Sequence, residues 1–141
     1  MKKLLINLTI ILLISSCSKL NFFGFGEKKN KFEELKINEF LWIASNDMLE
    51  SYPNKQNNLK EGYISTDWII LEEKPNIKFK ILIYILGSDL IEENVEILFD
   101  RQSLKNGVWI EEEVSELFKK RLQKNIISNA KKLKLKKDGK I

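Results

Sequence analysis

The 141 residues, 43% of them hydrophobic, are enough for one folded domain and too few for two of ordinary size. Because 24 lysines and arginines nearly balance 20 aspartates and glutamates, the net charge of +4 reflects local clusters of lysine and disfavours a nucleic-acid partner. The chain contains no histidine, the commonest general base and metal ligand near neutral pH, so we expect no enzyme activity and no metal or cofactor.

The first sixteen residues are organised like a bacterial export signal. Lys2 and Lys3 precede an apolar run from Leu4 to Ile14 that only two polar residues interrupt. A membrane-spanning helix needs about 20 predominantly apolar residues, so this run is too short for a permanent span. We therefore predict that residues 1–16 are a signal peptide that is removed.

The signal ends in Ile14-Ser15-Ser16-Cys17, which resembles the bacterial lipobox and contains the chain's only cysteine. The resemblance implies cleavage between Ser16 and Cys17 and acylation of Cys17, for instance by palmitate, as a membrane anchor. The alternative is an ordinary secretory signal that happens to precede a cysteine. Ser18 follows where an aspartate would stand in many retained lipoproteins, which resembles export to the periplasmic face of the outer membrane.

Residues 17–35 show neither helical nor strand periodicity, and we predict a lipidated cysteine followed by a flexible tether. Phe22, Phe23 and Phe25 in this tether either dip into the membrane interface or cover part of the domain, and the sequence leaves both open. A single domain is expected over residues 36–135, followed by a basic tail at 136–141.

The domain begins with a predicted helix from Lys36 to Tyr52, whose apolar residues recur every three or four positions before Pro53. Four strands are then predicted from alternation, at Tyr63–Leu71, Ile77–Leu86, around Val95 to Phe99, and at Val108–Ile110. Asn106-Gly107 is the dipeptide favoured in tight hairpin turns.

A long second helix is predicted after Ile110, because Glu111 to Glu113 suit the positive end of a helix dipole and apolar residues then recur from Val114 to Leu133. The order helix, four strands, helix contains no βαβ unit. We therefore expect an α+β fold, in which an antiparallel four-stranded meander carries an N-terminal helix and a long C-terminal helix on one face.

The strongest candidate interaction residues are Asp67, which interrupts an apolar strand, and the three tryptophans Trp42, Trp68 and Trp109. The bland interpretation of Asp67 is a solvated strand residue, since alternation places it opposite Trp68. Core packing competes in the same way with a ligand groove lined by the tryptophans, and it is the favoured interpretation. No catalytic, metal-binding or phosphate-binding spacing is present in the sequence.

Lysines crowd the end of the second helix, at Lys131, Lys132, Lys134, Lys136, Lys137 and Lys140. They are typical of a solvated helix end whose charges favour the dipole. The alternative is contact of Lys131, Lys132, Lys134, Lys136 and Lys137 with anionic lipid, where each contributes about 1 kcal/mol near the surface.

The stretch from Asn38 to Leu135 resembles a family of small proteobacterial lipoproteins catalogued as a domain of unknown function. The residues that carry the resemblance are the runs Phe40-Leu41-Trp42-Ile43-Ala44-Ser45, Gly62-Tyr63-Ile64-Ser65-Thr66-Asp67-Trp68 and Phe79-Lys80-Ile81-Leu82-Ile83-Tyr84-Ile85-Leu86, with Trp109 after the Asn-Gly turn. The Thr66-Asp67-Trp68 step is also similar to the BamC lipoproteins of the outer-membrane β-barrel assembly machinery, which implies a helix-grip arrangement.

These features predict a noncatalytic lipoprotein, anchored through Cys17, that binds envelope proteins and supports outer-membrane biogenesis or integrity. The competing hypothesis is a lipid- or amphiphile-binding module with a groove between the sheet and the C-terminal helix. An enclosed apolar cavity would favour that module, whereas a filled core with an exposed apolar or edge-strand patch would favour protein binding.

Overall fold

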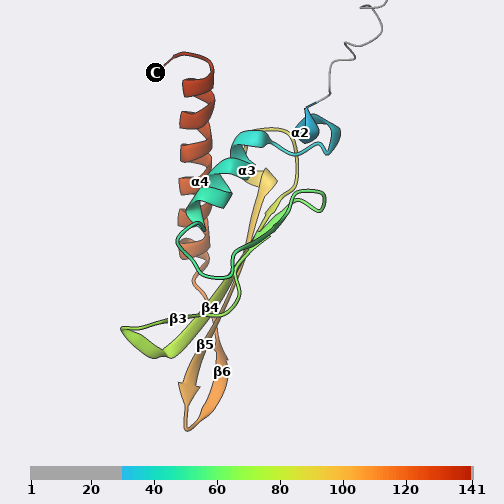
Figure 1. Ribbon diagram of the computed structural model, residues 1–141. Coiled ribbons are helices and arrows are strands. Elements are labelled where there is room, and N and C mark those ends of the chain that lie inside the picture. The colour runs from blue at the N-terminus through green and yellow to red at the C-terminus, as the bar shows by residue number, and fades with distance from the viewer. Residues whose placement is uncertain (1–29, 141) are drawn as a thin grey trace, which may run out of the picture. The chain divides into compact units, whose positions relative to one another are not determined.

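The computed structural model describes residues 30–140, so the predicted signal peptide, Cys17 and most of the predicted tether lie outside the described residues. In chain order its elements are α2 (Lys31–Glu34), α3 (Glu39–Met48), β1 (Gln56–Asn58), β2 (Tyr63–Ser65), β3 (Ile69–Leu71), β4 (Lys74–Ile85), the 3-10 turn η2 (Glu92–Asn94), β5 (Val95–Lys105), β6 (Val108–Glu112) and α4 (Glu116–Lys137) (Figure 1). The predicted α+β class is confirmed, with an antiparallel sheet that follows an N-terminal helix and precedes a C-terminal helix in the chain.

The helix α3 is shorter than the predicted Lys36–Tyr52. It starts at Glu39 because the Asn38 side chain caps it, with Oδ1 accepting a hydrogen bond of 3.0 Å from the Leu41 N–H. Such a cap satisfies one of the free N–H groups of the first turn. The other end of the same side chain donates to the Ser88 carbonyl at 2.8 Å, which fixes α3 to the loop after β4.

The sheet has six antiparallel strands in the order β1-β2-β4-β5-β6, with β3 also paired to β4, so the prediction of four strands is wrong. One extra strand is β1, which forms in the polar segment before the first predicted strand and pairs with β2. The hairpin between them needs Gly62, whose φ is +72° and where a Cβ would approach the Ile85 carbonyl to 2.9 Å. The other arises because the expected strand Tyr63–Leu71 is interrupted and forms both β2 and β3.

The hairpin between β5 and β6 turns at Asn106 and Gly107, with φ values of 51° and 79°, as the Asn-Gly signal predicted. Glu111 and Glu112 are the last residues of β6 and not the start of a helix, which corrects the predicted helix boundary. Strand pairing holds them there, because Glu112 is opposite Arg101 in β5. α4 begins only at Glu116 and continues to Lys137.

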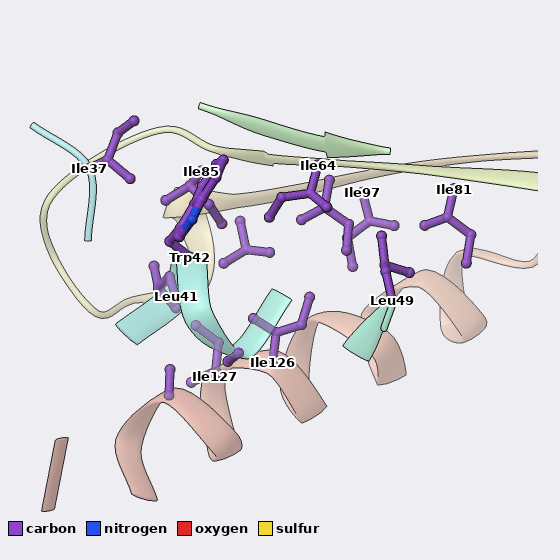
Figure 2. Packing of buried hydrophobic residues seen from close by; sticks show 14 residues of the cluster. Ile37, Leu41, Trp42, Leu49, Ile64, Ile81, Ile85, Ile97, Ile126 and Ile127 are labelled. Atoms are coloured by element: carbon purple, nitrogen blue, oxygen red, sulfur yellow. The ribbon is translucent and has the colours of Figure 1, made fainter. Parts of the chain in front are cut away.

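The core lies between one face of the sheet and the helices α3 and α4 (Figure 2). Alternate residues of the central strands point toward Ile126 and Ile127 of α4, while Leu41 and Trp42 of α3 fill the same layer. The sheet residues of this layer are Ile64, Ile81, Ile83, Ile85, Val95 and Ile97. Both helices therefore cover the same face, and the opposite face carries no helix among residues 30–140.

The helices cover only one half of the sheet. In Figure 1, β3, β6 and the ends of β4 and β5 nearest to them extend beyond α3 and α4. Exposed apolar side chains gather in this part of the domain, at Ile70, Leu71, Leu104, Val108 and Ile110. We call it the distal sheet. Because α3 and α4 do not cover the distal sheet, its apolar side chains are shielded from water only by neighbouring side chains or by a bound partner.

Candidate interaction surface

The distal sheet begins at an interruption between β2 and β3. Ser65 pairs with Leu82 and Ile69 pairs with Phe79, so four steps along one strand match three along β4. Thr66 anchors this bulge, because its N–H donates to the Ile81 carbonyl at 2.9 Å and its Oγ1 accepts from the Ile81 N–H at 3.0 Å. An extra residue in one strand reverses the alternation that follows it.

The reversal decides where Trp68 lies. Simple alternation grouped Trp68 with Ile64 and Ile70, but Ile69 is buried and Ile70 is 53% exposed. Trp68 is half-buried on the face opposite the helices, so the favoured prediction that it belongs to the core is wrong. Asp67 is exposed as predicted, and its Oδ1 accepts a hydrogen bond of 2.7 Å from the Trp68 N–H.

A lysine lies between two of the predicted tryptophans. The Nζ of Lys78 is 4.7 Å from the centre of the Trp68 ring and 4.5 Å from the centre of the Trp109 ring. Lys80 adds a third contact, at 5.2 Å from Trp68, and its Nζ is 3.1 Å from the Asp100 carboxylate. An ammonium group over an indole face is attracted by the ring quadrupole, by about 0.5–1 kcal/mol at an exposed site.

Four strands contribute to this surface. Ile70 is opposite Lys78 and Leu104 is opposite Trp109 in the strand register, and residues directly opposite each other share a face. We call the set the tryptophan patch and define it as Trp68, Ile70, Lys78, Lys80, Leu104 and Trp109. The bland interpretation is that the rings only shield the sheet from water, but exposed Ile70 and Leu104 leave the patch apolar toward solvent.

Trp42 is separate from the patch. It is 8% exposed and belongs to the core on the α3 side of the sheet, which agrees with the favoured core interpretation for this residue. The structure therefore brings together Trp68 and Trp109 but not Trp42. Sequence reasoning missed Lys78 and Lys80, although their alternation with Ile77 and Phe79 indicated that they face away from the core.

An apolar hollow of about 380 Å³ lies on the other face, where α4 begins beside the distal sheet. Phe79, Phe99 and Phe118 line it, and their rings are in contact: Phe79 and Phe99 stack at 5.3 Å, and Phe118 meets Phe99 edge-on at 5.2 Å. This hollow is the feature that corresponds best to the predicted groove between the sheet and the C-terminal helix.

The lysines predicted for membrane contact all lie on α4. Lys131, Lys132, Lys134 and Lys136 are exposed and form no ion pair among residues 30–140. Lys137 differs, because its Nζ is 2.8 Å from the Glu39 carboxylate and lies over the Phe40 ring. Lys137 therefore fastens α4 to α3.

No helix within residues 30–140 combines the length and apolarity needed to cross a bilayer. In the same range, no three of the residue types His, Cys, Asp and Glu are grouped closely enough to hold a metal ion. Ser16 and Cys17, predicted as the cleavage and lipidation residues, lie outside the described residues.

The fold and the exposed patch define a small α+β domain with one helix-covered and one open sheet face. The chain belongs to the family described as a domain of unknown function, DUF3576, whose family model matches residues 35–135. It is also 27% identical over 74 residues to Uncharacterized protein RP420 of Rickettsia prowazekii (strain Madrid E), a match that spans 52% of this chain and 44% of the relative. No solved structure matches the chain.

Proposed function

We propose that this protein is a noncatalytic envelope lipoprotein that binds other proteins through the tryptophan patch. The observation that carries the proposal is the placement of Lys78 between Trp68 and Trp109 on a sheet face that no helix of residues 30–140 covers. Binding interfaces concentrate their energy in a few aromatic and cationic anchors surrounded by apolar contacts. The patch combines aromatic, cationic and apolar side chains in this way, and none of them belongs to the core, which lies on the opposite face of the sheet.

The cellular setting of the proposal rests on the amino terminus. The signal-like residues 1–16 and the lipobox-like sequence before Cys17 support export and a lipid anchor. We propose the periplasmic face of the outer membrane as the location, and a role in outer-membrane biogenesis or integrity. The resemblances to proteobacterial lipoproteins and to BamC support the proposed role in outer-membrane biogenesis or integrity. The partners we propose are envelope proteins.

The rival function, binding of a lipid or amphiphile, is favoured by one observation, the apolar hollow beside Phe118. The volume of this hollow, about 380 Å³, lies near the lower end of the range of about 300–1,000 Å³ for small-molecule pockets. The contact between Phe118 and Phe99 argues against lipid binding, because the Phe118 ring already packs against the Phe99 ring of the sheet. A Phe118→Ala variant that bound a fluorescent fatty acid much more weakly than the parent would favour the rival function.

Site-directed photo-cross-linking in cells tests the protein-binding proposal. A photoreactive amino acid replaces Leu104 in the patch or, as a control, Leu135 on α4, and both positions are 39% exposed. We expect discrete cross-linked products from position 104 and none of the same mass from position 135. Trp109→Ala should remove those products, since truncating a central anchor costs about 2 kcal/mol or more of binding.

The folding of the variants must be checked, because Trp68 and Trp109 are half-buried. Melting curves of Trp68→Ala and Trp109→Ala provide this control. Equal products from both cross-linker positions, or products that persist in a folded Trp109→Ala variant, would contradict a partner on the patch.

A further inference from the structure

Among the described residues 30–140, the strand β5 has a neighbouring strand on only one side over its first half. β4 pairs with β5 from Val95 to Ser103, but β6 pairs only with Arg101 to Lys105. The stretch from Val95 to Asp100 therefore forms an open edge of the sheet. Such an edge presents unpaired main-chain groups that an added strand can use.

The hydrogen bonds at the start of β5 determine which main-chain groups face this edge. The Leu86 N–H donates to the Asn94 carbonyl at 2.9 Å, so even-numbered residues of β5 direct their groups toward β4. Val95, Ile97 and Phe99 must then face the open side. The side chain of Gln123 in α4 supports this assignment, because its Nε2 donates to the Val95 carbonyl at 2.8 Å.

Gln123 occupies only the beginning of the edge. Its second hydrogen bond, of 2.7 Å, goes to the Glu92 carbonyl, away from the rest of β5. Within residues 30–140, no hydrogen bond reaches the N–H or C=O of Ile97 or Phe99 from the open side. Two donors and two acceptors are thus available at the spacing of an antiparallel partner.

A groove of about 520 Å³ runs between this edge and the first half of α4. Ile97 and Leu98 line it on the strand side, and Lys119, Lys120 and Gln123 line it on the helix side. The edges of β3 and β6 differ, because these strands extend beyond α4 (Figure 1). A strand added beside Ile97 would therefore meet helix side chains as well as the main chain.

The groove carries both charges, because Glu93, Glu96 and Glu116 line it together with Lys119 and Lys120. Among residues 30–140, Glu93 and Glu96 form no ion pair. Lys119 pairs with Glu116 on its own helix at 2.8 Å, but Lys120 forms no ion pair among the described residues 30–140. Leu98 is 44% exposed beside the edge and offers an apolar contact. We propose that an extended segment of a partner protein, carrying an acidic residue opposite Lys120 and a basic residue beside Glu96, adds to β5 as a strand at Ile97 to Phe99.

This inference is independent of the tryptophan patch, because it concerns a strand edge beside α4 and the patch covers a face of the distal sheet. Main-chain pairing gives affinity in strand addition, and alternate side chains give specificity. A partner that carries an extended segment and also a surface complementary to the tryptophan patch would bind the edge and the patch with separate parts of its structure.

The first test selects random twelve-residue peptides, displayed on phage, against the full chain in detergent micelles. We expect enriched peptides that alternate apolar and other residues and include both an acidic and a basic residue. Synthetic copies are then N-methylated at alternate positions, because one alternate set of N–H groups faces β5 and the other faces solvent. Methylation of one set should weaken binding by about tenfold or more, from the loss of two hydrogen bonds, and methylation of the other set should have little effect.

The second test uses variants of the protein and hydrogen exchange. Lys120→Glu should lower the affinity for the peptide by about fivefold. The control Lys132→Glu should leave the affinity unchanged, because Lys132 lines a separate hollow with Asp47 on another side of α4. The bound peptide should slow exchange of the Ile97 and Phe99 amides. Failure to enrich any peptide, equal effects of both methylated sets, or protection of these amides by self-association without peptide would overturn the proposal.

Discussion

The difference between Trp42 and Trp68 illustrates how single residues in this chain divide between folding and binding. Both are large aromatic side chains in apolar sequence surroundings, yet Trp42 is enclosed by the core and Trp68 holds a lysine on the open face. The bulge at Thr66 produces this division, because one extra residue moves every following side chain of the strand to the other face.

Trp42→Ala should lower the free energy of unfolding by about 3–5 kcal/mol, since it leaves a large cavity between α3 and the sheet. Chemical denaturation followed by circular dichroism measures the loss. Trp68→Ala, which is half-buried, should cost clearly less. A Trp42 variant as stable as the parent would show that α3 does not depend on this ring.

Glu112 is the carboxylate most strongly tied to its surroundings. The Ser103 hydroxyl donates a 2.7 Å hydrogen bond to it and is the main reason that the pKa of Glu112 is lowered, with Lys105 and Arg101 acting in the same direction. A carboxyl whose pKa is lower in the folded state stabilises the fold above its unfolded pKa. This contribution is lost as the pH falls through the lower, folded value.

We therefore expect Glu112→Gln to reduce the dependence of the melting temperature on pH below the ordinary carboxyl range, about pH 4. Above that range the variant should melt below the parent, and the difference should shrink as the solution becomes more acidic. Asp67→Asn, at an exposed carboxylate without an ion pair among residues 30–140, is the control. A difference that stays constant with pH would contradict this role of Glu112.

At the scale of elements, α4 serves two functions along its length. Its middle contributes Ile126, Ile127 and Ala130 to the core, whereas its last turns hold exposed lysines and the contacts of Lys137 with Glu39 and Phe40 of α3. An exposed ion pair contributes little, because solvent screens the charges. Stability should therefore depend on the middle of α4 and only weakly on its end.

Removal of residues 134–141 should lower the free energy of unfolding by about 1 kcal/mol or less, the range of an exposed ion pair. Thermal melts of the truncated and complete chains check this.

The truncated and complete chains, each expressed from Ser18 so that Cys17 is absent, also test the proposed contact of the lysines with anionic lipid, measured as binding to anionic vesicles. We expect weak binding that the truncation reduces and that 0.1 M salt, with a screening length of about 10 Å, largely releases. Tight binding that survives high salt would indicate apolar insertion instead.

At the scale of the whole molecule, the proposed lipid anchor depends on one residue. Cys17→Ser should abolish labelling by a fatty-acid probe and leave uncleaved precursor, because no other cysteine can accept the diacylglyceryl group. Metabolic labelling and membrane fractionation measure both effects. If the variant is still cleaved and remains equally membrane-bound, the protein is not a lipoprotein of this kind.

The sequence by itself determined the fold class, the two main helices and the β5–β6 hairpin. These depend on local rules: apolar spacing for α3 and α4, alternation for β4 and β5, and the positive φ values that Asn106 and Gly107 tolerate. Asp67 is exposed as predicted, but it lies in the bulge and not opposite a core Trp68, which was the reason given for the prediction. The family membership of residues 35–135 agrees with the resemblance that the sequence motifs suggested.

Only the tertiary structure decided the number of strands, the start of α4 and the composition of the patch. Each depends on partners distant in sequence: β1 exists because β2 pairs with it, and Glu112 remains in a strand because Arg101 is opposite. Lys78 meets both Trp68 and Trp109 because β3, β4, β5 and β6 lie side by side after a one-residue bulge. Periodicity within a segment carries no information about such a shift in register, which the pairing with β4 alone fixes.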